Sequence, residues 1–257
     1  MNLKGLRVVL TRPQGQNEGL AEAIRAAGGT PIIFPVLAIS DPEDTVSLLA
    51  RLRELATYDL AIFISPNATH RAMALIRTQG GWPAGLSAAT VGPASAQALR
   101  DYGVTRVLVP TGSFDSEHLL ALPELQSMQG KRVLIFRGQG GRELLAETLR
   151  ARGAHVDYAE CYRRVLPDID PQPLRDAGAL GAIDAIVATS SEGLRNLHAM
   201  LGPQAQSWLF PTPLFLPHAR IAEEARKLGH SQIVATAPGD DGLLSALGLF
   251  SARVGHP

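Results

Sequence analysis

The amino-acid sequence predicts an α/β protein of two similar domains, each built on a doubly wound parallel sheet. Three observations predict this fold class. Short apolar runs alternate with longer amphipathic segments along all 257 residues. The second half repeats the first at an offset of 125 residues, and glycines lie where the helices between strands should end.

The expected strands form two sets of five. The first set is Leu6–Leu10, Pro31–Val36, Leu60–Ile64, Ala88–Val91 and Arg106–Val109. The second set is Arg132–Phe136, His155–Glu160, Ile183–Ala188, Pro213–Leu216 and Gln232–Ala235. Amphipathic segments such as Glu18–Ala27, Thr45–Ala56 and Glu143–Arg152 separate them and are expected as helices. Helical crossovers of this kind join parallel strands.

The repeat itself is visible without gaps. LRVVLTRPQGQNEGLAEAIRAAGG, from Leu6, matches KRVLIFRGQGGRELLAETLRARGA, from Lys131, at 12 of 24 positions. The same offset pairs Asp59 with Asp184 and Ser65 with Ser190. A strand, a turn and a helix shared in one register predict an internal duplication.

The composition is that of an ordinary globular protein. Hydrophobic residues make up 46% and charged residues 19%, with 24 basic and 24 acidic side chains. Without net charge, we expect no binding to nucleic acid or to a membrane surface. Cys161 is the single cysteine, and no apolar stretch has the length of a signal peptide or a membrane span. These features favour a cytoplasmic protein.

The candidate binding residues lie in the turns after the strands. In open parallel sheets, ligands bind at the carboxyl ends of strands, where helix N-termini present free backbone N–H groups. Small hydroxyl residues, glycines and arginines recur in these turns in both halves. The substrate-binding candidates are Thr11, Arg12, Ser65, Asn67, Gly92, Ser95, Arg137, Gly138, Arg142, Thr189, Ser190, Ser191, His218 and Arg220.

Each of these residues also has an ordinary structural explanation. Ser65 and Ser190 are explained individually as helix N-caps, although the whole set at one edge favours anion binding. Arg137 is placed to meet a carboxylate, whereas Arg142 fits a solvated helix face equally well. Tyr162 is either a core aromatic residue or a positioned O–H donor.

Several familiar chemistries are excluded by missing motifs. The loop Gly138–Glu143 lacks the third glycine of a dinucleotide-binding loop, and no phosphate-binding P-loop occurs. The seven histidines show no ligand spacing, so no metal site is expected. No Gly-x-Ser-x-Gly elbow appears, and nothing in the sequence activates Cys161. The predicted site is poor in strong catalysts and rich in hydrogen-bond donors.

An ordered set of motifs runs along nearly the whole chain. These are VVLTRP near the start, FISPNA, VGPASAQAL, VPTGSFDSEHLL, LIFRGQGGRE, ECYRR, ATSSEGL and RIAEEARKLG. This set resembles the uroporphyrinogen-III synthase family. The resemblance implies a cofactor-free enzyme that cyclises hydroxymethylbilane to uroporphyrinogen III, inverting ring D, in tetrapyrrole and heme biosynthesis. Tyr162 matches the family's tyrosine and is the candidate general acid.

The sequence departs from the family pattern at two candidate positions. Ser95 stands where the family commonly has threonine, so the hydroxyl is kept. His218 occupies a position that varies in the family, which puts an essential role for it in doubt.

The resemblance also implies how the chain is divided between the domains. The expected fold is two flavodoxin-like doubly wound parallel-sheet domains joined by a two-segment linker, with the active site in the interdomain cleft. Residues 1–36 with 167–257 would form one domain and residues 41–160 the other, with linkers at 37–40 and 161–166. The expected state is a monomer, with a transient hand-over of hydroxymethylbilane from hydroxymethylbilane synthase.

Two other classes of protein remain open from the residues alone. One is a two-lobed binding protein for a small anionic ligand, although such proteins are usually exported. The other is a nucleotide-dependent transferase with two α/β domains, which the missing phosphate loop disfavours. Titration with nucleotides and with polyanions separates these classes from the synthase.

Overall fold

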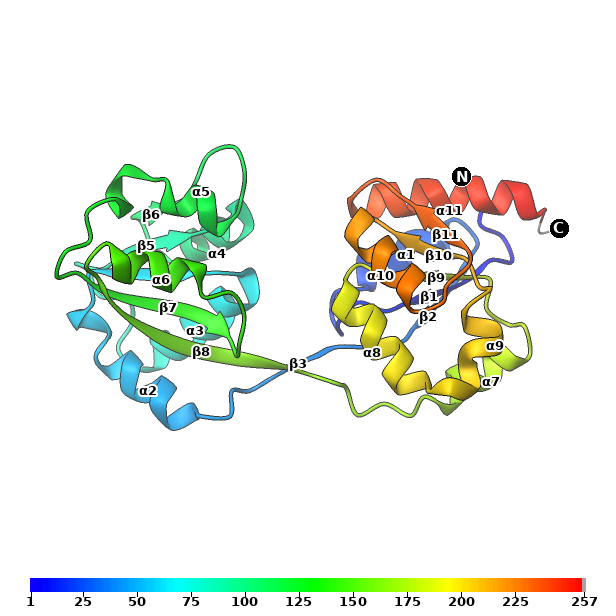
Figure 1. The fold of residues 1–257 in the computed structure, drawn as a ribbon, viewed down its shortest axis with the longest axis horizontal. Coiled ribbons are helices and arrows are strands. Elements are labelled where there is room, and N and C mark those ends of the chain that lie inside the picture. Colours follow the sequence, from blue (N-terminus) through cyan, green and yellow to red (C-terminus); the bar gives the residue numbers. More distant parts are fainter. Residues whose placement is uncertain (256–257) are drawn as a thin grey trace. The chain divides into compact units, whose positions relative to one another are not determined.

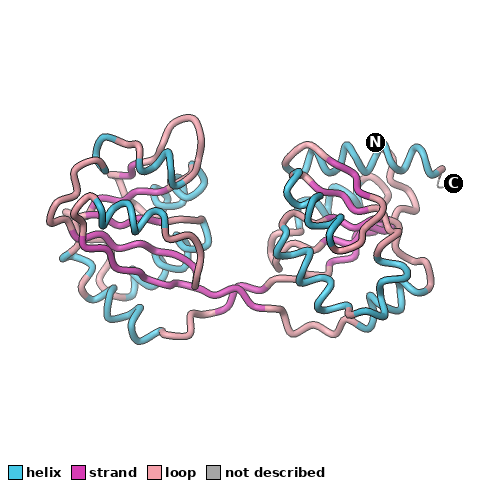
Figure 2. The backbone as a smooth tube through the Cα atoms, viewed as in Figure 1, coloured by secondary structure: helices cyan, strands magenta, loops and turns pink. Residues whose placement is uncertain are grey.

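A computed structural model describes residues 1–255 of the chain and divides it into two units. Unit 1 comprises Met1–Ala38 and the chain from Val165 onward, and unit 2 comprises Ile39–Arg164. Each unit is a sheet with helices on both faces (Figures 1 and 2). Unit 1 therefore contains both ends of the sequence, and unit 2 its middle.

The sheet of unit 1 has the strand order β11-β10-β9-β1-β2. Its strands are β1 (Arg7–Leu10), β2 (Thr30–Ile33), β9 (Ala185–Val187), β10 (Leu214–Leu216) and β11 (Ile233–Ala235). All neighbouring strands in it are parallel. Numbered by their order along the chain of unit 1, the strands are arranged 2-1-3-4-5, which is the flavodoxin-like order. The strands stay parallel, but the direction in which successive strands are added to the sheet switches between β1 and β9.

Helices cover the two faces of this sheet. On one face, α1 (Glu18–Ala26) and α11 (Gly239–Val254) bury leucines against β1, β9 and β10. The other face packs against a second group of helices (Figure 1). These are α7 (Gln172–Ala179), α8 (Ser191–Leu201), η3 (Pro203–Ala205), α9 (Gln206–Leu209) and α10 (Ala219–Lys227).

The sheet of unit 2 has the order β3-β8-β7-β4-β5-β6. Its strands are β3 (Ala38–Ser40), β4 (Leu60–Phe63), β5 (Ser87–Thr90), β6 (Val107–Leu108), β7 (Arg132–Gly138) and β8 (His155–Val165). One face packs against α2 (Thr45–Arg53), η1 (Leu55–Thr57), α3 (Pro66–Thr78) and α4 (Pro93–Asp101). The other packs against α5 (Ser116–Leu120), η2 (Pro123–Leu125) and α6 (Leu144–Ala151).

The two sheets repeat the same strand registers. Arg7 is level with Thr30 in unit 1, and Arg132 is level with His155 in unit 2, so both partners are shifted by the repeat offset. Unit 1 joins the first two strands of the first repeat to the last three of the second. Unit 2 joins the last three strands of the first repeat, β4, β5 and β6, to the first two strands of the second, β7 and β8.

Helix ends follow the glycines that the sequence singled out. Gly28 after α1 and Gly153 after α6 have φ angles of 88° and 91°, a left-handed conformation that costs glycine little. Their backbone N–H groups donate to carbonyl oxygens of the last helical turn, at Arg25 and Arg150, both over 2.9 Å. These equivalent glycines end equivalent helices and turn the chain into β2 and β8.

All ten expected strands are present, with ends shifted by a few residues. The segments 37–40 and 161–166, expected as linkers, are strand over most of their length, in β3 and in the end of β8. β8 continues because Cys161 and Tyr162 are both buried in the core of unit 2, with 1% and 2% exposure. A bulge in the β7–β8 pairing at Arg137 and Gly138 keeps Tyr162 level with Gly138.

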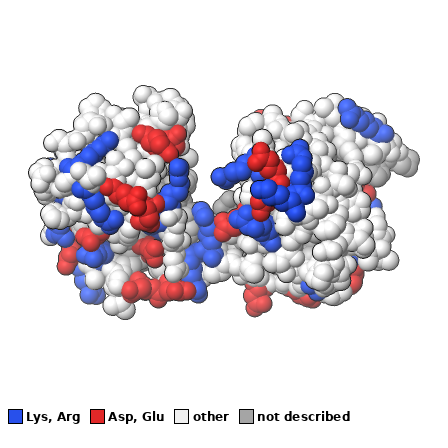
Figure 3. Space-filling model, in the orientation of Figure 1, with Lys and Arg blue, Asp and Glu red and all other residues white. Residues whose placement is uncertain are grey.

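The surface carries both signs of charge. On the face drawn in Figure 3, basic and acidic side chains are interspersed over each unit. Among the described residues, no helix is long and apolar enough to cross a membrane.

Candidate active site

The carboxyl end of the sheet in unit 2 brings a buried tyrosine beside a serine. Ser65 precedes α3 and accepts a hydrogen bond from the backbone N–H of Ala68 over 3.1 Å. Its Oγ also lies 3.3 Å from the hydroxyl of Tyr162. The tyrosine ring lies on the backbone of Gly138, where a Cβ would be 2.6 Å from Cε2. Glycine at 138 is therefore what admits the ring.

The loop that follows β7 is held by Arg137, which is buried with 3% exposure. Its Nε donates to the carbonyl oxygens of Gly138 and Gly140, over 3.3 Å and 3.0 Å. Its Nη1 donates to Glu143 Oε1 over 2.9 Å, and its guanidinium lies 4.6 Å from the centre of the Tyr158 ring. These contacts are to the loop itself and to Tyr158 on β8, so Arg137 fixes the conformation of the loop that carries Gly138.

Glu143 joins this arginine to Tyr158. Its second carboxylate oxygen accepts a hydrogen bond from the Tyr158 hydroxyl. This hydrogen bond, and then the one from Arg137, lower the pKa of Glu143. Burial, followed by the hydrogen bond to the carboxylate, raises the pKa of Tyr158. At neutral pH the cluster is therefore a carboxylate held between a guanidinium and a neutral phenol.

The remaining candidates of unit 2 occupy the starts of α3, α4 and α6. Gly92 is the N-cap of α4, Ser95 lies inside its first turn with 2% exposure, and Asn67 is half-buried in the first turn of α3. Arg142 is exposed and donates to Glu117 Oε1 over 3.0 Å. Arg142 also borders a cavity of about 260 Å³ between α5 and α6, together with Arg137 and Tyr158.

The carboxyl edge of unit 1 carries the other candidates. Thr11 is buried and donates from Oγ1 to the carbonyl oxygen of Val187 over 2.8 Å, which ties β1 to β9. Arg12 Nη1 lies 2.6 Å from Asp240 Oδ1. The Thr11 hydroxyl therefore stabilises the sheet, whereas Arg12 is partly exposed at this edge.

Further hydroxyls of unit 1 surround the start of α8. Ser190 accepts from the backbone N–H of Gly193 over 2.9 Å, the N-cap interaction that the sequence allowed. The Ser191 hydroxyl is buried and has no hydrogen-bond partner among the described residues. Thr189 is half-buried, and His218 and Arg220 are exposed at the start of α10. This edge therefore offers unused hydrogen-bonding groups.

Sequence reasoning missed the groups that hold the loops. Glu143, Tyr158 and Asp240 were not candidates, yet they bind the two equivalent arginines Arg137 and Arg12. A clue was present for Asp240, because Asp115 stands at the equivalent place in the first repeat. Nothing local marks Tyr158, which lies on β8 and reaches the loop only through the β7–β8 pairing.

Other reactive groups are unsuited to chemistry here. Burial raises the pKa of the Cys161 thiol to about 12, so the thiolate is not formed near neutrality. Among residues 1–255, no three histidine, cysteine, aspartate or glutamate side chains gather as a metal site would require.

The fold and this site define a class: a duplicated, doubly wound α/β protein with hydrogen-bond donors and one buried tyrosine at its strand ends. The family model described as uroporphyrinogen-III synthase HemD matches residues 18–245. The uroporphyrinogen-III synthase of Salmonella typhimurium is 36% identical, over 94% of this chain and all of that protein. The enzyme of Escherichia coli is 35% identical, with the same coverage. The chain belongs to the uroporphyrinogen-III synthase family.

A solved structure agrees in fold. A crystal structure of a mutant uroporphyrinogen III synthase from Thermus thermophilus has a TM-score of 0.64 at 22% identity. The match covers 97% of this chain and 98% of the Thermus thermophilus chain. At this identity the likeness concerns the fold, whereas the family assignment rests on the sequence matches.

Proposed function

We propose that this chain closes hydroxymethylbilane to uroporphyrinogen III with inversion of ring D. One observation carries the proposal beyond the family assignment: a buried tyrosine hydroxyl meets a half-buried serine at the strand ends of unit 2. The substrate needs little activation. Loss of its hydroxyl as water, after protonation, leaves an azafulvene cation that the pyrrole nitrogen stabilises.

The selectivity of the reaction is a problem of geometry. The cation must be attacked by the substituted carbon of ring D, which gives a spiro intermediate that fragments and recloses with the ring inverted. Holding this arrangement against simple head-to-tail closure is a task of proximity and orientation, which can contribute several kcal/mol. Hydrogen-bond donors fixed by strand ends suit that task better than a strong nucleophile.

Tyr162 is the proposed acid for the loss of water. Its side chain is buried, whereas Ser65 is half-buried and lies 3.3 Å from its hydroxyl. We therefore propose that the proton reaches the leaving hydroxyl through the Ser65 Oγ. General acid catalysis of this kind contributes about 10²–10⁴-fold to the rate.

The substrate's carboxylates are the proposed ligands of the exposed donors. Arg142 in unit 2 and Arg12 and Arg220 in unit 1 offer guanidinium groups, while the starts of α3 and α8 offer backbone N–H groups. In this proposal the carboxyl edge of each unit supplies donors for the substrate's carboxylates. A monomeric state, a cytoplasmic location and hand-over from hydroxymethylbilane synthase belong to the same proposal.

The test is the isomer that the enzyme forms. We expect purified protein, given freshly made hydroxymethylbilane, to yield mainly the type III isomer, measured by chromatography of the oxidised products beside a no-enzyme control. Folded protein that leaves only the type I product would overturn the proposal. Tight binding without turnover would instead favour the anion-binding protein.

The role of Tyr162 has its own test. Tyr162→Phe keeps the ring on Gly138 and should lower kcat by about 10²-fold or more, with little change in KM. Ser65→Ala should lower kcat as well if the proton passes through its hydroxyl. Tyr102→Phe is the matched control, since that tyrosine lies at the end of α4, away from the strand ends. Unchanged kcat in Tyr162→Phe removes the tyrosine from the acid role.

A further inference from the structure

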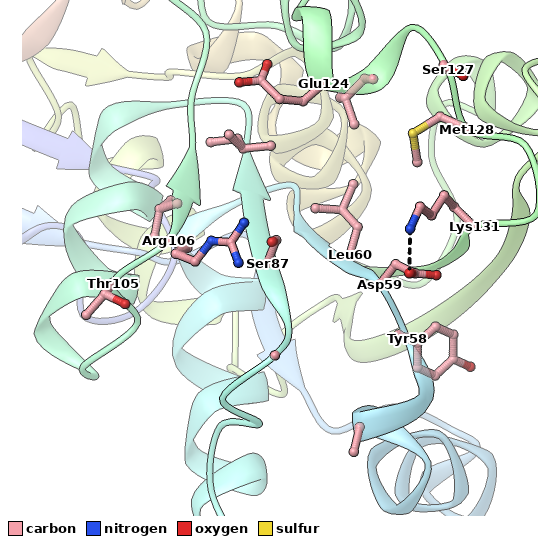
Figure 4. Close-up of a pocket in the computed structure, with 15 residues that line it drawn as sticks. Tyr58, Asp59, Leu60, Ser87, Thr105, Arg106, Glu124, Ser127, Met128 and Lys131 are labelled. Carbon is pink, nitrogen blue, oxygen red and sulfur yellow. Dashed lines mark hydrogen bonds and ion pairs between the residues drawn. The ribbon is translucent and has the colours of Figure 1, made fainter.

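A second cavity lies at the opposite, amino end of the sheet in unit 2. Its volume is about 760 Å³, within the usual range of small-molecule sites. The first residues of β4 and β5 and the residues just before and within β6 form one side, and the segment around η2 forms the other (Figure 4). The carboxyl-edge candidates lie at the other ends of the same strands, so this cavity is separate from the proposed active site.

The internal repeat shows why the cavity is open. In unit 1 the segment after the last strand is one helix, α11, of 16 residues. In the equivalent segment of unit 2 the α-helix ends at Leu120. Pro123 forces this change, because proline restricts the residue before it, and Leu122 is extended with φ −60° and ψ 139°. The chain then turns away as η2, and Leu125 and Met128 become a wall of the cavity.

One row of side chains crosses the floor of the cavity. Leu60 on β4 is level with Ser87 on β5. Arg106 continues the row, because its carbonyl oxygen accepts from the N–H of Ala88, the residue after Ser87. Residues at one level in neighbouring parallel strands point to the same face of the sheet. The row therefore places an apolar side chain, a hydroxyl and a guanidinium side by side, as Figure 4 shows.

The charged side chains around the cavity differ in whether they have an ion-pair partner. Lys131 Nζ donates to Asp59 Oδ1 over 2.9 Å, and Asp59 Oδ2 accepts from the backbone N–H of Arg132. These hydrogen bonds lower the pKa of Asp59, so the lysine and aspartate form a neutralised pair. Among the described residues, Arg106 has no ion pair or side-chain hydrogen bond, and neither has Glu124 on the far wall.

We propose that this cavity binds a small monocarboxylate with an apolar body. The carboxylate would accept hydrogen bonds from the Arg106 guanidinium and the Ser87 hydroxyl, a charge-assisted arrangement. The apolar body would lie against Leu60, Leu125 and Met128, which line the cavity. Glu124 adds negative charge on the far wall and so disfavours a polycarboxylate such as hydroxymethylbilane. The site is thus distinct from the proposed active site in ligand as well as in place.

The experiment uses 3-phenylpropionate as the probe, on the full-length protein. We expect it to shift the backbone NMR signals of Leu60, Ser87, Val107 and Leu125. The matched alcohol, 3-phenylpropan-1-ol, and propionate alone should bind at least about tenfold more weakly, because each lacks one half of the interaction. An alcohol that binds as tightly as the acid would contradict the assignment of the carboxylate.

Variants locate the site. Arg106→Gln should weaken binding of 3-phenylpropionate about tenfold or more, while Arg106→Lys keeps the charge and should lose less. Arg77→Gln is the matched control, because Arg77 is also an exposed arginine of unit 2 without a partner among the described residues. No shift in the wild-type protein, or equal binding by Arg106→Gln, overturns the proposal. Turnover should be unchanged in Arg106→Gln, so this test is independent of the synthase activity.

Discussion

The contact between Gly138 and Tyr162 predicts that one added methyl group disturbs the proposed active site. In Gly138→Ala the new Cβ would lie 2.6 Å from Cε2 and 2.7 Å from Cζ of the tyrosine ring. Carbon atoms in favourable contact are about 3.5–4.0 Å apart, so the ring must move by roughly 1 Å. The backbone itself is no obstacle, because Gly138 is not among the glycines with positive φ.

The magnitude follows from where the ring is. Tyr162 has 2% exposure and packs in the core of unit 2, so the displaced ring meets other buried side chains. Overpacking of this kind costs about 1–3 kcal/mol, more than the roughly 0.5–1 kcal/mol that alanine gains over glycine within a strand. A displacement of the hydroxyl from Ser65 by about 1 Å should also lower kcat by about 10²-fold.

The assay is urea unfolding followed by tryptophan fluorescence. Trp82 lies in unit 2, beside Phe63, and Trp208 lies in unit 1, so a Trp208→Phe background reports on unit 2 alone. Gly85→Ala is the control, because no atom lies within 4 Å of its added Cβ. We expect Gly85→Ala to leave the unfolding free energy almost unchanged.

A double-mutant cycle isolates the contact. Tyr162→Ala removes the ring, so Gly138→Ala should cost almost nothing in that background. The expected coupling is about 1–3 kcal/mol, equal to the cost of Gly138→Ala in the protein with the tyrosine. If Gly138→Ala is as destabilising without the ring as with it, the steric explanation is wrong.

Two further predictions concern unit 1. Burial, and then the neighbouring His198, lower the pKa of His230 to about 4, with the two Nε2 atoms 2.9 Å apart. The folded pKa lies below the unfolded value of about 6.5, so the stability that neutral His230 contributes is present above pH 6.5 and is lost as the pH falls toward 4. We expect the free energy of unfolding in urea to fall by about 3 kcal/mol over this range. A His230→Leu protein with the same pH dependence would contradict this. In α7, Gly178→Ala should destabilise by about 1–3 kcal/mol despite the better helix propensity of alanine, because its Cβ would lie 2.1 Å from the Trp208 ring. Gly19→Ala, with only an ordinary contact at 3.8 Å, should be neutral or stabilising, and equal effects of the two alanines in thermal unfolding would refute the argument.

The strands and their pairing were predictable because the signals that specify them are local and repeated. Runs of four to six residues predicted all ten strands of the repeat, and the repeat offset also relates the strand registers of the two sheets. β3 was missed because Ala38–Ser40 is short and its residues are only half-buried. The end of β8 was missed because the family resemblance implied a linker at residues 161–166, although Cys161 and Tyr162 face the core.

The candidate site was predictable only in outline. The turns after the strands hold the chosen serines, glycines and arginines, and Ser65 and Ser190 cap helices as expected. The partner of each arginine was not predictable, because it depends on how a loop folds back. Arg137 meets Glu143 six residues on, whereas the equivalent Arg12 meets Asp240 at the other end of the sequence. Similar sequences thus gave different loop contacts.

The exchange of strands between the repeats explains why the serine and tyrosine meet in unit 2 only. Ser65 belongs to the first repeat and Tyr162 to the second, and they lie in one unit because β4 pairs with β7, the neighbour of β8. In unit 1 the equivalent serine is Ser190, but the residue equivalent to Tyr162 is Leu37. Leucine has no proton to give, so unit 1 retains the helix cap without the hydroxyl pair. If Tyr162 supplies the acid, the duplicated edges have therefore diverged in role: unit 2 would provide chemistry and binding, and unit 1 binding alone.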